Sequence, residues 1–109
     1  MSNSVKREFK FKLPLMNNNG KSLSDLHKQV EVDLCNKFGG LTKTNQEGAW
    51  VNPIDGKLFV EPVVEYIVAI NPDDQIWALL YVRNLGEHAK QEAMYVVKTC
   101  GNVSFINIS

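Results

Sequence analysis

Two carboxylates, Glu61 and Glu65, interrupt an apolar run that is rich in valine and isoleucine. A charge inside such a run needs a partner or an open cleft. Because the two glutamates are an even number of residues apart, a regular strand places both on one face, unless Pro62 breaks the alternation. Paired carboxylates suit acid/base chemistry, a metal or a cationic ligand. The alternative is that both face water at a sheet edge, or pair with Arg7 or Arg83.

Three further side chains are candidates for a ligand site. Trp50 follows a glycine in a predicted short hairpin, where its indole is either a stacking platform or a cover for one end of the core. Tyr66 lies next to the central carboxylates. Gln91 opens the penultimate predicted strand, where it completes a pocket with Glu61, acts as an N-cap or fixes the strand register. The predicted ligand-binding residues are therefore Trp50, Glu61, Tyr66 and Gln91.

His27 lies within the apolar stripe of a predicted helix, with Glu31 one turn further on and Cys35 one turn beyond that. The functional interpretation is a metal site or an acid/base pair. Because Cys35 is rotated off the stripe and no second His or Cys has ligand spacing, a structural histidine is favoured. The sequence also lacks a phosphate loop, a nucleophile elbow and a Cys-x-x-Cys pair. We therefore predict no metal site and no cofactor.

Length and charge limit the possible classes of protein. The 109 residues predict a single domain, 1–109, and the twelve basic residues balance the twelve acidic ones. A net charge near zero favours neither nucleic acid nor a membrane surface as a partner. The first twelve residues contain no continuous apolar stretch that would be typical of an export signal, so we expect a cytoplasmic protein with free thiols at Cys35 and Cys100.

The periodicity of apolar residues predicts a chain that mixes strands and helices. Residues 5–13 alternate as a strand does, and residues 24–38 carry one helical stripe that ends at two glycines. Residues 72–89 begin with a good helix cap, although the apolar run 76–82 leaves a hairpin strand as an alternative. Further strands are predicted over 41–44, 49–51, 57–70, 91–98 and 103–108, with a turn at 45–48 and a bulge, edge or break at Pro62.

This order of elements predicts an α+β fold, a two-layer sandwich of the ferredoxin-like kind. Its sheet is mainly antiparallel, with two helices on one face. Lys6, Lys10 and Lys12 would keep part of the other face wet, and the valines of the central strand would leave the rest apolar. Since an exposed apolar sheet face usually has a partner, we predict a homodimer or a higher oligomer.

Several short segments form a pattern that covers most of the chain. The middle carries Phe38-Gly-Gly-Leu-Thr42, Gly48-Ala-Trp50, Gly56 and Glu61, and the end carries Gln91-Glu92-Ala-Met-Tyr95 before the strand 103–106. This pattern resembles a family of small uncharacterised bacterial and phage domains. The sequence departs from the family at 38–40, where many members have a proline-containing segment, and in the second helix, which is more polar in the similar proteins. The resemblance implies an α/β fold and no particular reaction.

Three functions remain open from the sequence. The leading hypothesis is a small binding module, such as a phage inhibitor or sequestering protein, that holds a small molecule or a partner protein in a cleft. The second is a cofactor-free enzyme in which Glu61 or Glu65 is the base and His27 or His88 is the second titrating group. The third is a dimeric interaction domain without a pocket. A buried glutamate pair would favour the enzyme, and solvated carboxylates beside an apolar cleft would favour binding.

Overall fold

The computed structural model describes residues 5–108 of the chain. The expectation about an export signal rests partly on residues 1–4, which lie outside the described part, as residue 109 does. The elements are β1 (Arg7–Pro14), α1 (Ser24–Phe38), β2 (Thr42–Val51), β3 (Leu58–Ile70), the 3-10 helix η1 (Pro72–Asp74), α2 (Gln75–His88), β4 (Ala93–Val97) and β5 (Val103–Asn107).

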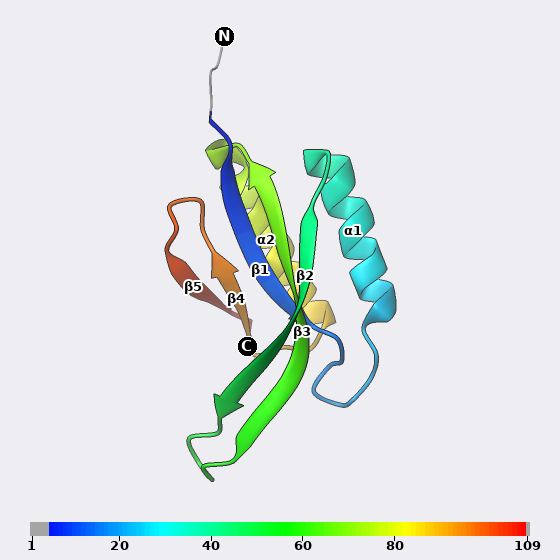
Figure 1. Ribbon diagram of the computed structural model, residues 1–109, viewed down its shortest axis with the longest axis vertical. Coiled ribbons are helices and arrows are strands. Elements are labelled where there is room, and N and C mark those ends of the chain that lie inside the picture. Colours follow the sequence, from blue (N-terminus) through cyan, green and yellow to red (C-terminus); the bar gives the residue numbers. More distant parts are fainter. Residues whose placement is uncertain (1–4, 109) are drawn as a thin grey trace.

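The five strands form one antiparallel sheet in the order β2-β3-β1-β4-β5. In Figure 1, α2 lies behind the strands, α1 lies to the right of β2, and the β2–β3 hairpin extends beyond the other strands. Both helices pack against the same buried core. The α+β class, the antiparallel sheet and the two helices are thus confirmed. The fifth strand lies at the edge, next to β4.

The core lies between the sheet and the two helices. In the β1–β3 register Phe9 faces Val68 and Phe11 faces Tyr66, and all four side chains are buried. Their positions alternate along each strand, as the sequence pattern predicts. The other residues of the core are Leu13, Leu23, Val30, Leu34, Val64, Ile70, Ala78, Val82, Leu85, Ala89, Met94 and Val96.

Helix α1 has the predicted bounds. Its apolar stripe packs Val30 and Leu34 into the core, and Gly39 ends it with a left-handed φ of 86°. The N-cap residue, Leu23, makes no capping hydrogen bond through its side chain. The hydroxyl of Ser22 accepts a hydrogen bond from the Ser24 backbone N–H at 3.2 Å. The helix is therefore stabilised mainly by its buried face.

Residues 76–82 are helical, so the alternative of a hairpin strand is wrong. The side chain of Asn71 accepts a hydrogen bond from the Asp73 backbone at 3.1 Å, and Pro72 occupies the first helical position. Helix α2 then buries Ala78 and Val82. Within residues 5–108, no helix is both long and apolar enough to cross a membrane.

The turn predicted at 45–48 is absent, whereas Pro62 lies just beyond the part of β3 that pairs with β1, as the edge alternative predicts. The predicted turn at 45–48 is part of a continuous β2, because Asn45 and Gly48 pair with Val64 and Glu61 of β3. Strand β3 also continues through Pro62. The Pro62 carbonyl accepts from the Leu15 backbone N–H, and the nitrogen of a strand residue faces the same neighbour as its carbonyl. The nitrogen of Pro62 therefore faces the side on which β1 has already ended. Because it does not face β2, its lack of an N–H costs no hydrogen bond to that strand.

Candidate functional site

One face of the sheet is not covered by helices, and we call it the open face. Because side chains alternate along a strand, the neighbours of core residues point to this face. Glu61 and Glu65 both lie on it, since β3 stays regular through Pro62. Among its members are Lys10, Lys12, Thr44, Gln46, Trp50, Phe59, Glu61, Glu65, Tyr95 and Phe105.

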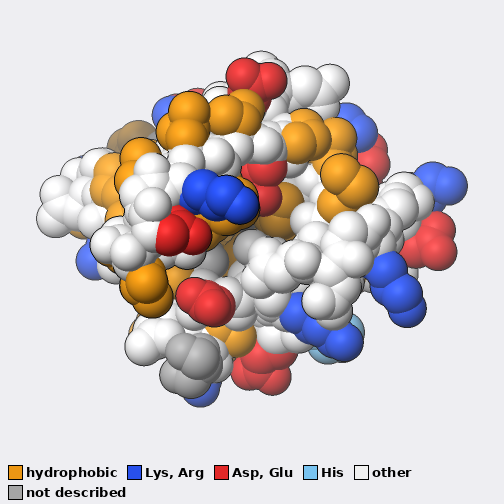
Figure 2. Space-filling model, turned by 90° about the horizontal axis from the view of Figure 1, so that it is seen from below, with side chains coloured by type: hydrophobic (Ala, Val, Ile, Leu, Met, Phe, Trp, Pro, Cys, Tyr) orange, Lys and Arg blue, Asp and Glu red, His pale blue; other side chains and the backbone are white. Residues whose placement is uncertain are grey.

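An aromatic pair stands on the open face of the β2–β3 hairpin. Trp50 and Phe59 are cross-strand partners whose rings stack with centroids 4.7 Å apart and planes tilted by 16°. Both remain exposed, Trp50 at 49% and Phe59 at 40%. Exposed hydrophobic side chains lie beside acidic and basic ones at this end of the molecule (Figure 2). The indole therefore does not cover the core, and it is available as a stacking surface.

Glu61 lies beside this aromatic pair. It is two residues from Phe59 on the same face of β3, and its cross-strand partner is Gly48. Because glycine has no side chain, nothing from β2 stands directly opposite the Glu61 carboxylate. Within residues 5–108, no ion pair includes Glu61. The aromatic pair and the carboxylate together suit a flat ring that carries or adjoins a positive charge.

Two further contacts, one between Gln46 and Glu65 and one between Lys12 and Tyr95, lie along the open face. The Gln46 amide donates to a carboxylate oxygen of Glu65 at 3.3 Å. The ammonium of Lys12 lies 4.6 Å from the centre of the Tyr95 ring. Glu65 and Lys12 are half-buried, so these groups are held in place more firmly than freely solvated side chains.

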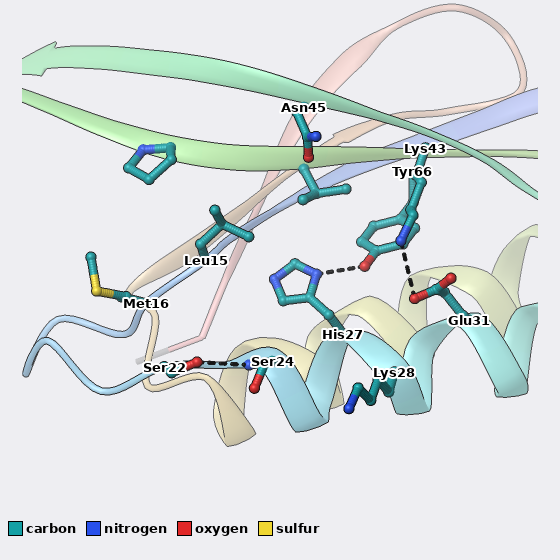
Figure 3. Close-up of a pocket in the computed structure, with 12 residues that line it drawn as sticks. Leu15, Met16, Ser22, Ser24, His27, Lys28, Glu31, Lys43, Asn45 and Tyr66 are labelled. Carbon is teal, nitrogen blue, oxygen red and sulfur yellow. Dashed lines mark hydrogen bonds and ion pairs between the residues drawn. The ribbon is translucent and has the colours of Figure 1, made fainter.

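Tyr66 lies on the opposite, helix-covered face, where it is fully buried. Its hydroxyl hydrogen-bonds Nδ1 of His27, and Nε2 of His27 donates to the Pro14 carbonyl at 2.8 Å. A carbonyl only accepts, so Nε2 carries the proton and Nδ1 accepts from the Tyr66 hydroxyl. Figure 3 shows the two side chains pointing toward one another between α1 and β3. His27 thus donates to Pro14 and not to Glu31, and its two hydrogen bonds join α1 to β1 and β3.

The surroundings of Tyr66 disfavour its ionised form. Burial, and next the negative charge of Glu31, raise the pKa of the Tyr66 hydroxyl well above its ordinary value of 10. The hydroxyl therefore stays protonated at neutral pH and remains a hydrogen-bond donor to His27. It is not available as a general base.

A cavity of about 560 Å³ opens beside Tyr66, between α1 and the β2–β3 hairpin. Lys43 of β2 reaches across to Glu31 of α1, with nitrogen and oxygen 3.2 Å apart, whereas Lys28 points away from the space (Figure 3). The apolar side of the cavity comes from Leu15, Met16, Pro62 and Val64. Three of its polar side chains, Tyr66, His27 and Glu31, therefore already have partners.

The four predicted ligand residues do not share one site. Trp50 and Glu61 are neighbours on the open face, Tyr66 is on the other face, and Gln91 lies between α2 and β4. There the Gln91 amide donates to the Ala89 carbonyl at 3.2 Å, which gives it a local structural role. Within residues 5–108, no group of three or more His, Cys, Asp or Glu side chains is placed to hold a metal ion.

Two residues of the open face were missed by sequence reasoning. Phe59 was absent from the predicted site because its pairing with Trp50 depends on the hairpin register. For Lys12 the sequence predicts only a solvent-exposed position on this face. Its alternation with buried aromatics placed it on this face correctly, but the contact with Tyr95 joins β1 to β4 and has no local signal in the sequence.

Comparison with solved structures shows that the fold of this chain is shared with two of them. The chain is similar to a phage SAM lyase in complex with S-methyl-5′-thioadenosine, with a TM-score of 0.70 and 17% identity, over 98% of this chain and 93% of that one. The apo state of a phage SAM lyase matches with a TM-score of 0.66 and 17% identity, over 98% and 92%. No protein-family model matches the chain, and no curated protein matches it. At this level of identity the likeness shows a shared fold.

Proposed function

We propose that this protein binds a nucleoside of the S-adenosylmethionine (SAM) and S-methyl-5′-thioadenosine class on its open face. The observation that carries the proposal is the exposed Trp50–Phe59 pair with the Glu61 carboxylate beside it. A purine base stacks on exposed aromatic rings, with ring centres about 4.5–7 Å apart. The sulfonium of SAM, which the ribose separates from the base, is attracted by the Glu61 carboxylate.

The cavity on the other face is a weaker candidate for this ligand. Its buried polar groups, Tyr66 and His27, are hydrogen-bonded to each other and to Pro14, so a ligand would have to displace existing bonds. Glu31, the carboxylate at the cavity, is already paired with Lys43. The open face offers a carboxylate and two rings without such competition.

The shared fold supports this choice of ligand class. A phage SAM lyase that holds S-methyl-5′-thioadenosine aligns with nearly the whole chain, which makes that ligand the first to test. We assign β1 to β4, with the two helices, to a ferredoxin-like unit to which β5 adds an edge strand. The open face is then the side of this unit without helices.

Binding is tested by calorimetric titration of the protein with S-methyl-5′-thioadenosine and with SAM. Trp50→Leu should weaken both ligands about tenfold or more, since stacking on an aromatic contributes about 1–3 kcal/mol per base. Glu61→Gln should weaken the binding of SAM more than that of S-methyl-5′-thioadenosine, whose sulfur is uncharged. The matched controls are Trp77→Leu, which removes an indole stacked on Tyr81 of α2, and Glu47→Gln, on the other face of the hairpin. If neither ligand binds, the proposal is wrong.

We further propose that the open face mediates self-association. Phe105 is 66% exposed and Val103 is 54% exposed on the edge strand β5, and both lie on this face. A second copy would cover these side chains and turn the open platform into a cleft. The chain has no net charge to oppose contact between copies.

A second candidate function is turnover of SAM, because both structural neighbours are lyases. The Glu–His pair expected of an acid/base enzyme has no support in the geometry. His27 is on the other face of the sheet, and His88 hydrogen-bonds the Asn84 carbonyl in α2. Turnover would therefore depend on Glu61, and formation of S-methyl-5′-thioadenosine from SAM should cease in Glu61→Gln. Unchanged SAM after prolonged incubation would leave binding as the function.

A further inference from the structure

A row of side chains crosses the whole open face. Glu65 of β3 is the cross-strand partner both of Thr44 in β2 and of Lys12 in β1. The row continues through the contact of the Lys12 ammonium with Tyr95, which pairs with Phe105 in β5. It is thus one continuous line that runs across the strands, and it contains both a carboxylate and an ammonium.

The carboxylate and the ammonium of this row are not paired with each other. Within residues 5–108, no ion pair joins Lys12 to Glu65, although adjacent strands are only about 5 Å apart. The Lys12 ammonium instead lies over the Tyr95 ring, and one Glu65 oxygen accepts from Gln46. Two opposite charges are therefore held side by side with hydrogen-bonding capacity left over.

We infer that Lys12 and Glu65 bind the α-amino-acid end of a SAM-type ligand, which makes them specificity-determining residues. The α-carboxylate is complementary to the Lys12 ammonium, and the α-ammonium is complementary to Glu65. This inference rests on the proposed function, which places the adenine at Trp50 and Phe59. It distinguishes ligands that have the amino-acid arm from S-methyl-5′-thioadenosine, which lacks it.

The spacing along β3 agrees with this orientation. Phe59 and Glu65 are six residues apart, which corresponds to about 20 Å along a strand. The Glu65 side chain and a hydrogen bond of about 2.9 Å shorten the gap that the ligand must span. Ribose, sulfur and two methylene groups separate the adenine from the α-carbon and fill the remaining length. Glu61 lies between the two ends, where the sulfur would lie.

The test compares two thioethers, both with a neutral sulfur, that differ only in the arm. S-adenosylhomocysteine carries the α-amino acid on sulfur, and S-methyl-5′-thioadenosine carries a methyl group there. The wild-type protein should bind S-adenosylhomocysteine about tenfold more tightly, or better. Lys12→Gln and Glu65→Gln should each reduce that preference to about twofold or less, without weakening S-methyl-5′-thioadenosine comparably. Lys10→Gln is the matched control. Lys10 is on the same face of β1, but its Nζ lies 3.7 Å from Oε1 of Glu8 and so already has an acidic partner.

The possible results separate this inference from the proposed function. If the wild-type protein binds both thioethers equally, or if Lys12→Gln and Glu65→Gln keep the wild-type preference, the inference is wrong while nucleoside binding stands. If Lys10→Gln removes the preference as strongly as Lys12→Gln does, the preference comes from the general positive charge of this face. The specific contact with Lys12 is then wrong. If neither thioether binds, both the inference and the proposed function are wrong.

Discussion

Glu65 and Tyr66 are consecutive residues of β3, yet their side chains lie on opposite faces of the sheet. Glu65 belongs to the open face and accepts a hydrogen bond from Gln46, whereas Tyr66 is buried against α1 and hydrogen-bonds His27. Replacing each residue should therefore change a different property. Substitutions on the Tyr66 side should change stability, and substitutions on the Glu65 side should change ligand affinity.

Tyr66→Phe should destabilise the fold by about 1–3 kcal/mol, because it leaves Nδ1 of buried His27 without its donor. Urea denaturation measures this loss. Tyr81→Phe is the matched control, since the Tyr81 hydroxyl donates to Asp33 at 2.7 Å in a half-buried place where water can replace it. An equal or larger loss in Tyr81→Phe would contradict the structural role of the Tyr66–His27 bond.

Stability should fall as the pH rises above 10. The pKa of Tyr66 is raised in the folded state, so above pH 10 the unfolded chain loses this proton while the folded chain keeps it. The unfolded state then binds fewer protons, and each pH unit costs about 1.4 kcal/mol per such group. Denaturant titrations at several alkaline pH values should show a shallower decline in Tyr66→Phe. Parallel declines in the two proteins would show that Tyr66 does not carry this dependence.

Self-association should depend on the open face. In sedimentation velocity over a range of concentrations, the wild-type chain should form a dimer or higher oligomer, and Phe105→Asp should shift it toward the monomer. Ile76→Asp is the control, because Ile76 is 73% exposed on α2, in the helical layer. A wild-type monomer at all micromolar concentrations, or an oligomer that only Ile76→Asp disrupts, would refute association through this face.

Gly86 should not tolerate a larger residue. A methyl group at this position of α2 would lie 2.7 Å from a side-chain carbon of Ile108 and 2.8 Å from one of Met94. Overpacking costs about 1–3 kcal/mol, and the better helix propensity of alanine offsets about 1 kcal/mol. Gly86→Ala should therefore lower the melting temperature, and Ile108→Ala should reduce the cost of that substitution. A Gly86→Ala variant as stable as the wild type would contradict the close packing of α2 against Met94 and Ile108.

Local signals predicted the helices well, because they depend on neighbouring residues. The stripe from Leu26 to Leu34 and the stop at Gly39 define α1, and the Asn71-Pro72 cap defines the start of the second helical segment. The hairpin was less predictable. Polar residues at 45–48 have turn-like composition, but they pair along the whole length of β3, and that tertiary pairing outweighs their local preference.

The candidate site was predictable in part. Glu61 and Glu65 were expected on one face, and the regular β3 confirms it. The inclusion of Tyr66 in the same site conflicts with strict alternation from Glu65, a signal that was present in the sequence. The contacts of Trp50 with Phe59 and of Lys12 with Tyr95 depend on strand register, which a single sequence does not determine.

The central claim is that a nucleoside stacks on Trp50, and the chain allows a direct test because it has only two tryptophans. Trp77→Phe leaves Trp50 as the sole indole, and Trp50→Phe leaves Trp77. Titration with S-methyl-5′-thioadenosine should change the fluorescence of the Trp50-only protein in a saturable way and leave the Trp77-only protein unchanged. A silent Trp50 at saturating nucleoside, or a response from Trp77 alone, would contradict binding on the open face.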